Sequence, residues 1–239
     1  MTKRCMTNSR LGQVAAALMI LGLAAAGARA ENQGGYAPPP TGLELTWARG
    51  QTASEAVKEK YHYRVIRADG EEALYLIKSK GKPDDRVHLF RSLFSYAYWK
   101  EGQHWVEYKF DRVSLRKLWP LAPGKETRVK MRFGYGEGKT IEQAKANWKE
   151  TEAGEIHYRV LRREKVTVPA GTFDAFAIER VRQFIRHDGG AKTVERRVGW
   201  LVPKLGFVVK QNFHKNIGGS REKKFVIQVI SVKRPSSAK

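Results

Sequence analysis

The chain has 239 residues, of which 45 are Lys or Arg and 24 are Asp or Glu, so its formal net charge at pH 7 is +21. It has one cysteine, Cys5, which excludes an internal disulfide framework and a thiolate metal cluster. Burial of apolar side chains must therefore stabilise the fold, and the basic excess predicts attraction to polyanions rather than any particular fold.

The first thirty residues predict a leader for export. Basic residues near the start are followed by a mostly apolar run from Leu11 to Leu23 and then by Ala28-Arg29-Ala30. Charge, apolar run and A-x-A in this order are typical of a signal peptide, here cleaved near Ala30. The run is shorter than the roughly 18 to 20 residues that a membrane-spanning helix needs. We expect a periplasmic or secreted protein, and the alternative is an uncleaved N-terminal anchor.

The basic excess is uneven along the chain. Without residues 1–30, the chain keeps 41 basic and 24 acidic residues, a net charge of +17. From Glu155 onward there are 19 basic and 7 acidic residues, so the C-terminal part is the more cationic. In an exported protein this balance favours lipopolysaccharide, anionic phospholipid headgroups or cell-wall polymers over nucleic acid, and no nucleic-acid partner is expected. The alternative is that the charge only maintains solubility.

The predicted domain organisation is simple. Residues 31–43 hold two adjacent glycines and three prolines, a composition typical of a mobile or extended linker. A single β-rich domain is expected over residues 44–234, followed by a disordered tail at residues 235–239. Near the start of the domain, Thr52-Ala53-Ser54-Glu55 has the spacing of a capping box and predicts a short helix to about Lys60.

Two hairpins are expected in the first half of the domain. Residues 61–66 alternate with period two and turn at Ala68-Asp69-Gly70-Glu71 into residues 73–78. Residues 93–99 and 104–110 form the second predicted hairpin, because they are rich in Tyr and Trp, which suit a pleated sheet.

The middle of the domain predicts one strand and one helix. Two prolines within residues 118–124 exclude a central strand there. Residues 127–135 alternate between apolar side chains and Arg or Lys, which predicts a strand that is apolar inside and basic outside. Residues 140–150 predict a helix, with Thr140 as its N-cap and Gln143 at the capping-box position.

The C-terminal part is predicted to be β throughout. Residues 156–168 and 172–184 form a hairpin around Pro169-Ala170-Gly171, a three-residue loop in which glycine takes the left-handed conformation. Three further strands are expected at residues 193–201, 207–213 and 224–232. The last of them is apolar at both odd and even positions, so both of its faces need cover.

Two motifs in this part resemble those of a large family of uncharacterised bacterial secreted proteins. One is V-P-A-G-T-F, within Val166 to Phe176, and the other is W-x-x-P-x-x-G-x-V, within Gly199 to Lys210. The resemblance covers roughly residues 118–213. That family is similar to the half-barrel fold of the periplasmic lipoprotein carriers, which implies a mainly β protein. The implied fold is a curved antiparallel sheet with one or two short helices around an apolar cavity.

No motif predicts catalysis or metal binding. The six histidines are scattered singly, and Asp84-Asp85 is predicted to lie in a solvated turn. The sequence lacks the G-x-S-x-G signature of an activated serine, and the glycines of residues 134–138 are typical of a flexible connection. We expect no cofactor and favour a protein without enzymatic activity. A cofactor-free envelope enzyme is the weaker alternative.

Six residues are candidates for a ligand site, because tryptophans suit an apolar cavity as well as a core and arginines suit an anionic headgroup. They are Trp99, Trp105, Trp119, Trp200, Arg196 and Arg197. The leading hypothesis is a non-catalytic binding protein that holds a lipid, a lipoprotein or another amphipathic ligand. The alternative is a basic structural protein of the envelope that binds lipopolysaccharide or cell-wall polyanions through outer basic faces, such as that of residues 128–132.

Overall fold

The computed structural model describes most of the predicted domain. The described ranges are residues 36–50, 59–82, 84–100, 104–186, 193–217 and 221–235. The predicted leader, the start of the linker, most of the predicted capping-box helix and the last residues of the tail lie outside these ranges. Within them, no helix is long and apolar enough to cross a membrane.

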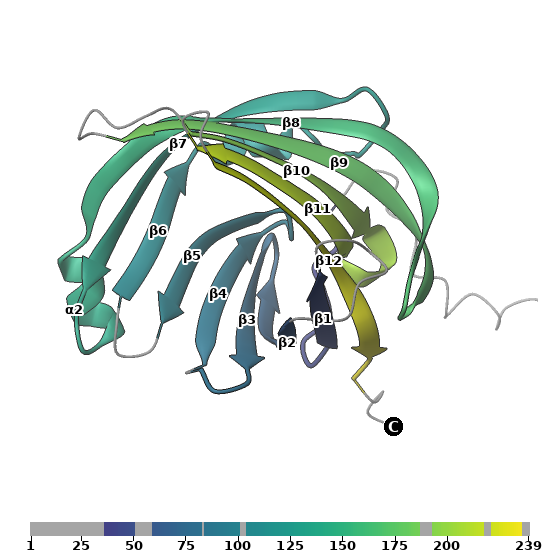
Figure 1. The fold of residues 1–239 in the computed structure, drawn as a ribbon, viewed down its shortest axis with the longest axis horizontal. Helices are drawn as coiled ribbons and strands as arrows, with labels where there is room; N and C mark the ends of the chain where they lie inside the picture. The colour runs from purple at the N-terminus through teal and green to yellow at the C-terminus, as the bar shows by residue number, and fades with distance from the viewer. Residues whose placement is uncertain are drawn as a thin grey trace, which may run out of the picture. The chain divides into compact units, whose positions relative to one another are not determined.

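Strands make up almost all of the described structure (Figure 1). They are β1 (Glu44–Gly50), β2 (Glu59–Asp69), β3 (Glu72–Ser79), β4 (Asp85–Phe90), β5 (Phe94–Lys100), β6 (His104–Phe110), β7 (Glu126–Glu137), β8 (Lys149–Val168), β9 (Gly171–Arg186), β10 (Thr193–Val202), β11 (Phe207–Ile217) and β12 (Arg221–Lys233). The helical elements are α1 (Arg112–Arg116), α2 (Ile141–Ala146) and the 3-10 turn η1 (Pro203–Leu205). The structure is therefore mainly β with short helices, as predicted.

The strands pair antiparallel in chain order, and the first strand also pairs with the last. In β1, Leu45 lies opposite Tyr63 of β2 on one side and Val232 of β12 on the other, so the sheet closes into a barrel. The long strands β8 and β9 arch over the shorter strands β3 to β6 (Figure 1). The predicted half-barrel is wrong, because β1, which was not predicted, joins the two edges of the sheet.

Apolar side chains pack the interior toward one end of the barrel. We name the two ends after their helices: α1 and η1 connect strands at the α1 end, and α2 connects β7 to β8 at the α2 end. Leu115 and Leu118 are fully buried at the α1 end. They share one core with an aromatic group in which the ring centroid of Phe207 lies 5.2 Å from that of Tyr75 and 5.6 Å from that of Trp47.

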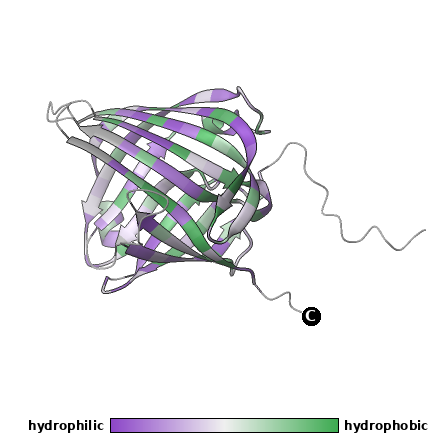
Figure 2. Ribbon diagram, turned by 45° about the vertical axis from the view of Figure 1, so that its right-hand side comes forward, coloured by the Kyte–Doolittle hydropathy of each residue, from purple (hydrophilic) through white to green (hydrophobic). Residues whose placement is uncertain are grey.

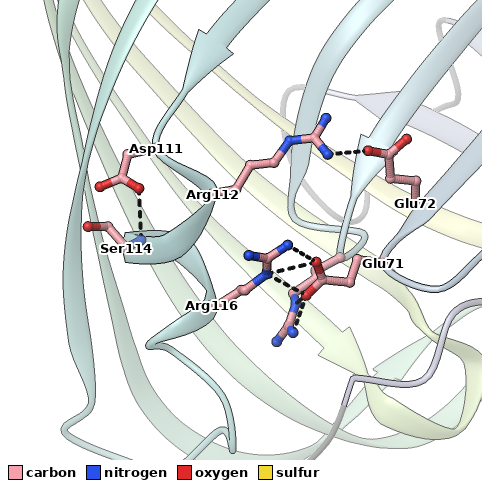
Figure 3. A network of polar contacts seen from close by, with 7 residues as sticks. Glu71, Glu72, Asp111, Arg112, Ser114 and Arg116 are labelled. Carbon is pink, nitrogen blue, oxygen red and sulfur yellow. Dashed lines mark hydrogen bonds and ion pairs between the residues drawn. The ribbon is translucent and has the colours of Figure 1, made fainter.

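Ion pairs fasten α1 to the turn between β2 and β3 (Figure 3). The Nη2 atom of Arg116 donates to Glu71 Oε2 at 2.6 Å, and the Nε atom of Arg91 donates to Glu71 Oε1 at 2.6 Å. Nearby, Arg112 Nη1 lies 2.6 Å from Glu72 Oε1. These contacts hold a helix of only five residues across the α1 end.

Residues 36–40, which belong to the predicted linker, pack against the same end. The hydroxyl of Tyr36 lies 2.7 Å from Ser92 Oγ, and its ring meets that of Trp119 edge-on at 5.9 Å between centroids. Gly206 permits the approach, because a Cβ atom there would lie 2.5 Å from the carbonyl oxygen of Ala37. The structure thus places part of the predicted linker on the barrel itself.

Alternation along the strands separates the inner face from the outer face, as the interleaved green and purple residues of Figure 2 show. In β7, Val129 and Met131 are buried, whereas Arg128, Lys130 and Arg132 are exposed. This arrangement confirms the predicted strand that is apolar inside and basic outside.

The capping signal at the start of α2 is confirmed. Thr140 Oγ1 accepts a hydrogen bond from the backbone N–H of Gln143 at 3.3 Å, and Gln143 Oε1 accepts one from the N–H of Lys139 at 3.1 Å. The helix is shorter than predicted. It ends at Ala146, because Lys149 already begins β8.

The glycines before α2 do not form the predicted flexible connection. Gly134 and Gly136 belong to β7, and the helix and its C-terminal neighbour Trp148 pack closely on them. A Cβ atom at Gly136 would lie 1.9 Å from the carbonyl oxygen of Ala144, and one at Gly134 would lie 2.6 Å from the Trp148 ring. The absence of side chains therefore lets a helix lie against the outer face of the strand.

The β8–β9 hairpin covers the last strand. Val168 and Gly171 pair directly, so the loop is Pro169-Ala170 and has two residues rather than the predicted three. Gly171 adopts a positive φ of 130°. At the tip, the N–H of Ala170 donates to the carbonyl oxygen of Val229 in β12 at 3.3 Å. The hairpin thus supplies cover for a strand whose apolar residues fall on both faces.

The other predicted strands and hairpins agree with β2, β3, β5, β6 and β10 to β12. Two strands and one helix were not predicted: β1, β4 and α1. Asp85 begins β4 rather than lying in a solvated turn, and Lys60 belongs to β2 rather than to the end of a helix.

Candidate functional site

Three arginines form a cluster on the inner face of the barrel. Arg180 and Arg182 belong to β9 and Arg197 to β10. Arg180 lies opposite Tyr158 on one side and Arg197 on the other, while Arg182 lies opposite Ile156. Because directly opposed residues in antiparallel strands share a face, and Tyr158 and Ile156 are buried in the core, these guanidinium groups point inward.

Glu195 joins two of these arginines. It is 4% exposed, and its Oε1 atom accepts hydrogen bonds from Arg180 Nη2 at 2.5 Å and from Arg197 Nε at 2.7 Å. Burial alone would raise the pKa of Glu195, but the nearby guanidinium groups outweigh burial and lower this pKa to about 2. The carboxylate is therefore ionised at neutral pH.

Arg182 spans the interior. Its Nη1 atom donates to the hydroxyl of Tyr108 at 2.9 Å, and its Nη2 atom lies 3.6 Å from Glu152 Oε2. Its guanidinium carbon lies 4.2 Å from the centroid of the Phe184 ring. Tyr108 belongs to β6, which is not a neighbour of β9 in the sheet, so this hydrogen bond joins two distant strands through the barrel.

Arg197 differs from the other two in its access to solvent. Its side chain is 34% exposed, compared with 13% for Arg180 and 11% for Arg182. The guanidinium carbon lies 4.7 Å from the centroid of the Phe213 ring, a cation–π contact that holds the side chain in place. Burial and the positive charge of Arg180 lower the pKa of Arg197 to about 10, which still leaves it a cation at neutral pH.

Carboxylates accompany these arginines on the inner face. Glu195 lies beside Arg180 and Arg197, and Glu152 lies beside Arg182. Asp85 also faces inward, because it has the same parity in β4 as Val87, which lies opposite Tyr98. Among the described side chains, a single carboxylate, that of Glu195, bonds to both Arg180 and Arg197.

Aromatic side chains continue the inner face toward the α2 end. Tyr98 and Tyr135 both lie opposite Val106, and Phe133 lies opposite Tyr108, so all share the face of the arginine cluster. Tyr135 is 45% exposed. The inner face at this end thus combines a solvent-accessible cation with partly exposed aromatic rings, whereas the α1 end is packed.

The structure separates most of the residues predicted for a ligand site. Trp99 and Trp105 lie opposite each other and pack with Ala144 of α2, so they stand on the outer face of the barrel. Trp119 lies at the α1 end, where it contacts Tyr36. These tryptophans share no common site, and none of them lies in the arginine cluster.

The remaining three candidates lie on β10. Trp200 shares the outer face with Arg196 and donates from Nε1 to Glu164 Oε1 at 2.8 Å. Arg196 is 61% exposed and pairs with Glu179, its Nε atom donating to Glu179 Oε1 at 2.6 Å. Arg197 alone among the six candidates points into the barrel.

Sequence reasoning missed Arg180, Arg182 and Glu195. A signal for them exists: Arg180 and Arg182 have the same parity along the strand as Ile178 and Phe184, which are buried. In such a strand, charged residues alternate into the face whose other residues are apolar. When a neighbouring strand places an opposite charge on the same face, as Glu195 does here, the pattern indicates a buried polar cluster.

A scan against protein-family models finds no match, and a search of curated proteins finds none. The similar solved structures include three bacterial proteins. A Bacteroides fragilis protein described as exported, with a YmcC-like fold, has a TM-score of 0.47 at 13% identity, covering 84% of this chain and 100% of its own. A lipoprotein from Parabacteroides distasonis has a TM-score of 0.42 at 13% identity, covering 82% and 97%. The lipoprotein YmcC from Escherichia coli has a TM-score of 0.47 at 8% identity, covering 82% and 85%.

These structures are similar to the chain at a level that carries no conclusion about a ligand. The resemblance to the family of secreted proteins, based on the motifs within Val166 to Phe176 and Gly199 to Lys210, stays a prediction because no family model matches.

Proposed function

We propose that this chain is an exported, non-catalytic binding protein of the bacterial envelope, periplasmic or secreted, that holds an amphipathic ligand such as a lipid or a lipidated peptide. The ligand contacts the inner face of the barrel at the α2 end. The observation that supports this proposal is the combination of Arg197, an inward cation accessible to solvent, with the aromatic rings of Tyr98, Phe133 and Tyr135. Sites for amphipathic molecules combine apolar walls with a few polar anchors in this way.

The titration behaviour of the cluster favours binding over acid–base chemistry. A general acid or base works best when its pKa lies near the operating pH. The pKa of Glu195 is lowered to about 2 and that of Arg197 is about 10, so neither group exchanges protons readily at neutral pH. Both instead hold fixed charges, which suits recognition of a charged ligand.

The outer face offers weaker support for adhesion to polyanions. Arg128 Nη1 lies 3.4 Å from Glu155 Oε1, and Arg132 Nη1 lies 3.4 Å from Glu150 Oε2. Arg196 is paired with Glu179. These carboxylates offset positive charge on the face where a polyanion would dock, so the structure favours the inner face as the binding site.

Native mass spectrometry of the protein purified from its host envelope tests the proposal. We expect a fraction that carries one lipid-sized molecule and keeps it after a wash in about 1 M salt, because salt screens surface charges far more than buried contacts. Protein that emerges without any bound amphiphile would contradict the proposal. Release of the bound material by salt would instead favour adhesion at the outer face.

A further inference from the structure

We propose that Arg197 is the anchor for the anionic group of the ligand, a carboxylate or a phosphate, and that this group enters the barrel from the α2 end. This inference rests on the proposed binding function and assigns the residue and the ligand chemistry that the function leaves open. It excludes neutral and cationic amphiphiles as the preferred ligands.

The other two arginines of the cluster are more deeply buried than Arg197, and the Nε atom of each is buried without a hydrogen-bond partner among the described side chains. Arg180 donates to Glu195, and Arg182 donates to Tyr108 and lies beside Glu152. Arg197 gives only its Nε atom to Glu195. Across the residues with described side chains, its two terminal nitrogens have no acceptor within hydrogen-bonding distance, so they are available to a ligand oxygen.

The guanidinium of Arg197 is also positioned in advance. It lies over the ring of Phe213, which stacks on Phe225 with 4.2 Å between centroids. From the next strand, β1, the guanidinium carbon of Arg49 lies 4.1 Å from the Phe225 centroid, and Arg49 pairs with Glu59. Because the stack and Glu195 restrain Arg197 together, little conformational entropy is lost when it binds an anion.

Electrostatics favours an anion at this position. Arg180 stands next to Arg197 on the neighbouring strand, and the two guanidinium groups share the carboxylate of Glu195. A carboxylate or phosphate beside Arg197 gains a charge-assisted hydrogen bond in surroundings drier than bulk water. A neutral headgroup gains no such charge-assisted bond.

Adjacent arginines on opposite faces provide a matched pair of variants. Arg197→Gln and Arg196→Gln remove the same charge one residue apart, the first from the inner face and the second from the outer face. Arg197→Gln leaves Glu195 paired with Arg180, so we expect this variant to fold. A third variant, Arg197→Lys, keeps the positive charge but loses the planar pair of donors. Thermal unfolding of each variant checks the fold.

The measurement is isothermal titration of the exported chain with four probes at about 0.15 M salt. The probes are dodecyl phosphate, laurate, dodecyl maltoside and inorganic phosphate, each amphiphile below its micelle concentration. We expect the wild-type protein to bind the two anionic amphiphiles and to bind the maltoside weakly. Arg197→Gln should weaken binding of the anionic amphiphiles about tenfold or more, whereas Arg196→Gln should leave it unchanged.

The outcomes separate this inference from the function on which it rests. Equal binding of dodecyl phosphate by the wild type and Arg197→Gln would overturn the anchor but support the binding function. Absence of binding by any amphiphile would overturn the binding function. Inorganic phosphate bound as tightly as dodecyl phosphate, and lost in Arg197→Gln, would support the anchor and show that the ligand needs no apolar tail.

Discussion

Glu195 is the residue on which the inner cluster depends. Its carboxylate accepts hydrogen bonds from Arg180 and Arg197 while it is almost completely buried. Two guanidinium groups side by side repel each other, and the carboxylate between them offsets this repulsion. The arrangement depends most on Glu195, because loss of its charge leaves two neighbouring guanidinium groups without the carboxylate that they share.

Replacing Glu195 with Gln should therefore destabilise the protein. We expect Glu195→Gln to lower the free energy of unfolding by about 3 kcal/mol, because a buried ion pair that loses one partner leaves charge uncompensated. Urea denaturation at neutral pH measures the change. The matched control is Glu155→Gln, which removes an exposed partner of Arg128 and should cost less than about 1 kcal/mol. A loss as small as the control's would contradict the network assigned to Glu195.

The same carboxylate predicts sensitivity to acid. Its pKa in the folded protein is about 2, below the ordinary value of 4.5, so its ionised form stabilises the fold above about pH 4.5. This contribution is lost as the pH falls from there toward about 2. Unfolding free energies measured across that window should decline more steeply for the wild type than for Glu195→Gln. Parallel decline of the two proteins would show that Glu195 is not the responsible group.

At the scale of single residues, the sequence could identify Arg197 as a candidate but could not show that it points into the barrel. Arg196 and Arg197 are adjacent, and both parities of β10 mix charged with apolar residues, so alternation alone does not tell which arginine lies inside. The register decides it: Arg197 lies opposite Arg180, which in turn lies opposite the buried Tyr158. That register depends on the turns between strands, and a single strand carries no information about it.

At the scale of helices and strands, the contact between α2 and β7 depends on Gly136 having no side chain. We expect Gly136→Ala to lower the free energy of unfolding by about 1 to 3 kcal/mol, because the new methyl group would meet the backbone of α2 and force the helix away from the strand. Glu142→Ala, an exposed change within the same helix, should alter stability by less than about 0.5 kcal/mol. Chemical denaturation compares the two variants, and equal effects would show that the close approach at Gly136 is not needed.

Elements with strong local signals could be predicted, and those without could not. The alternation in β7 and the cap at Thr140 are local features, and both are found in the structure. β4 has six residues and follows directly on a turn rich in Lys, Gly and Asp, which hides its start at Asp85. α1 has a single helical turn capped by Asp111, too short to show a helical period.

At the scale of the whole molecule, the sequence pattern could not predict that the sheet closes into a barrel. β1 and β12 stand at opposite ends of the domain, and their pairing, such as Thr46 with Ser231, is set by the curvature accumulated over all the strands between them. Local periodicity predicts strands but not whether the first and last meet. A half-barrel and a closed barrel are therefore indistinguishable at the level of the sequence, and closure determines whether the arginine cluster is surrounded on every side.

A cross-link between the first and last strands tests closure directly. In a Cys5→Ser background the chain has no other thiol, so Thr46→Cys combined with Ser231→Cys should oxidise to a disulfide. Directly opposed residues in antiparallel strands have Cα atoms about 4.5 to 5.5 Å apart, within the range a disulfide spans. The control pairs Thr46→Cys with Lys130→Cys on β7, which is not adjacent to β1 and should stay reduced. Intact mass spectrometry after mild oxidation detects the bond, and a Thr46–Ser231 pair that remains reduced would show that the two edges of the sheet do not meet.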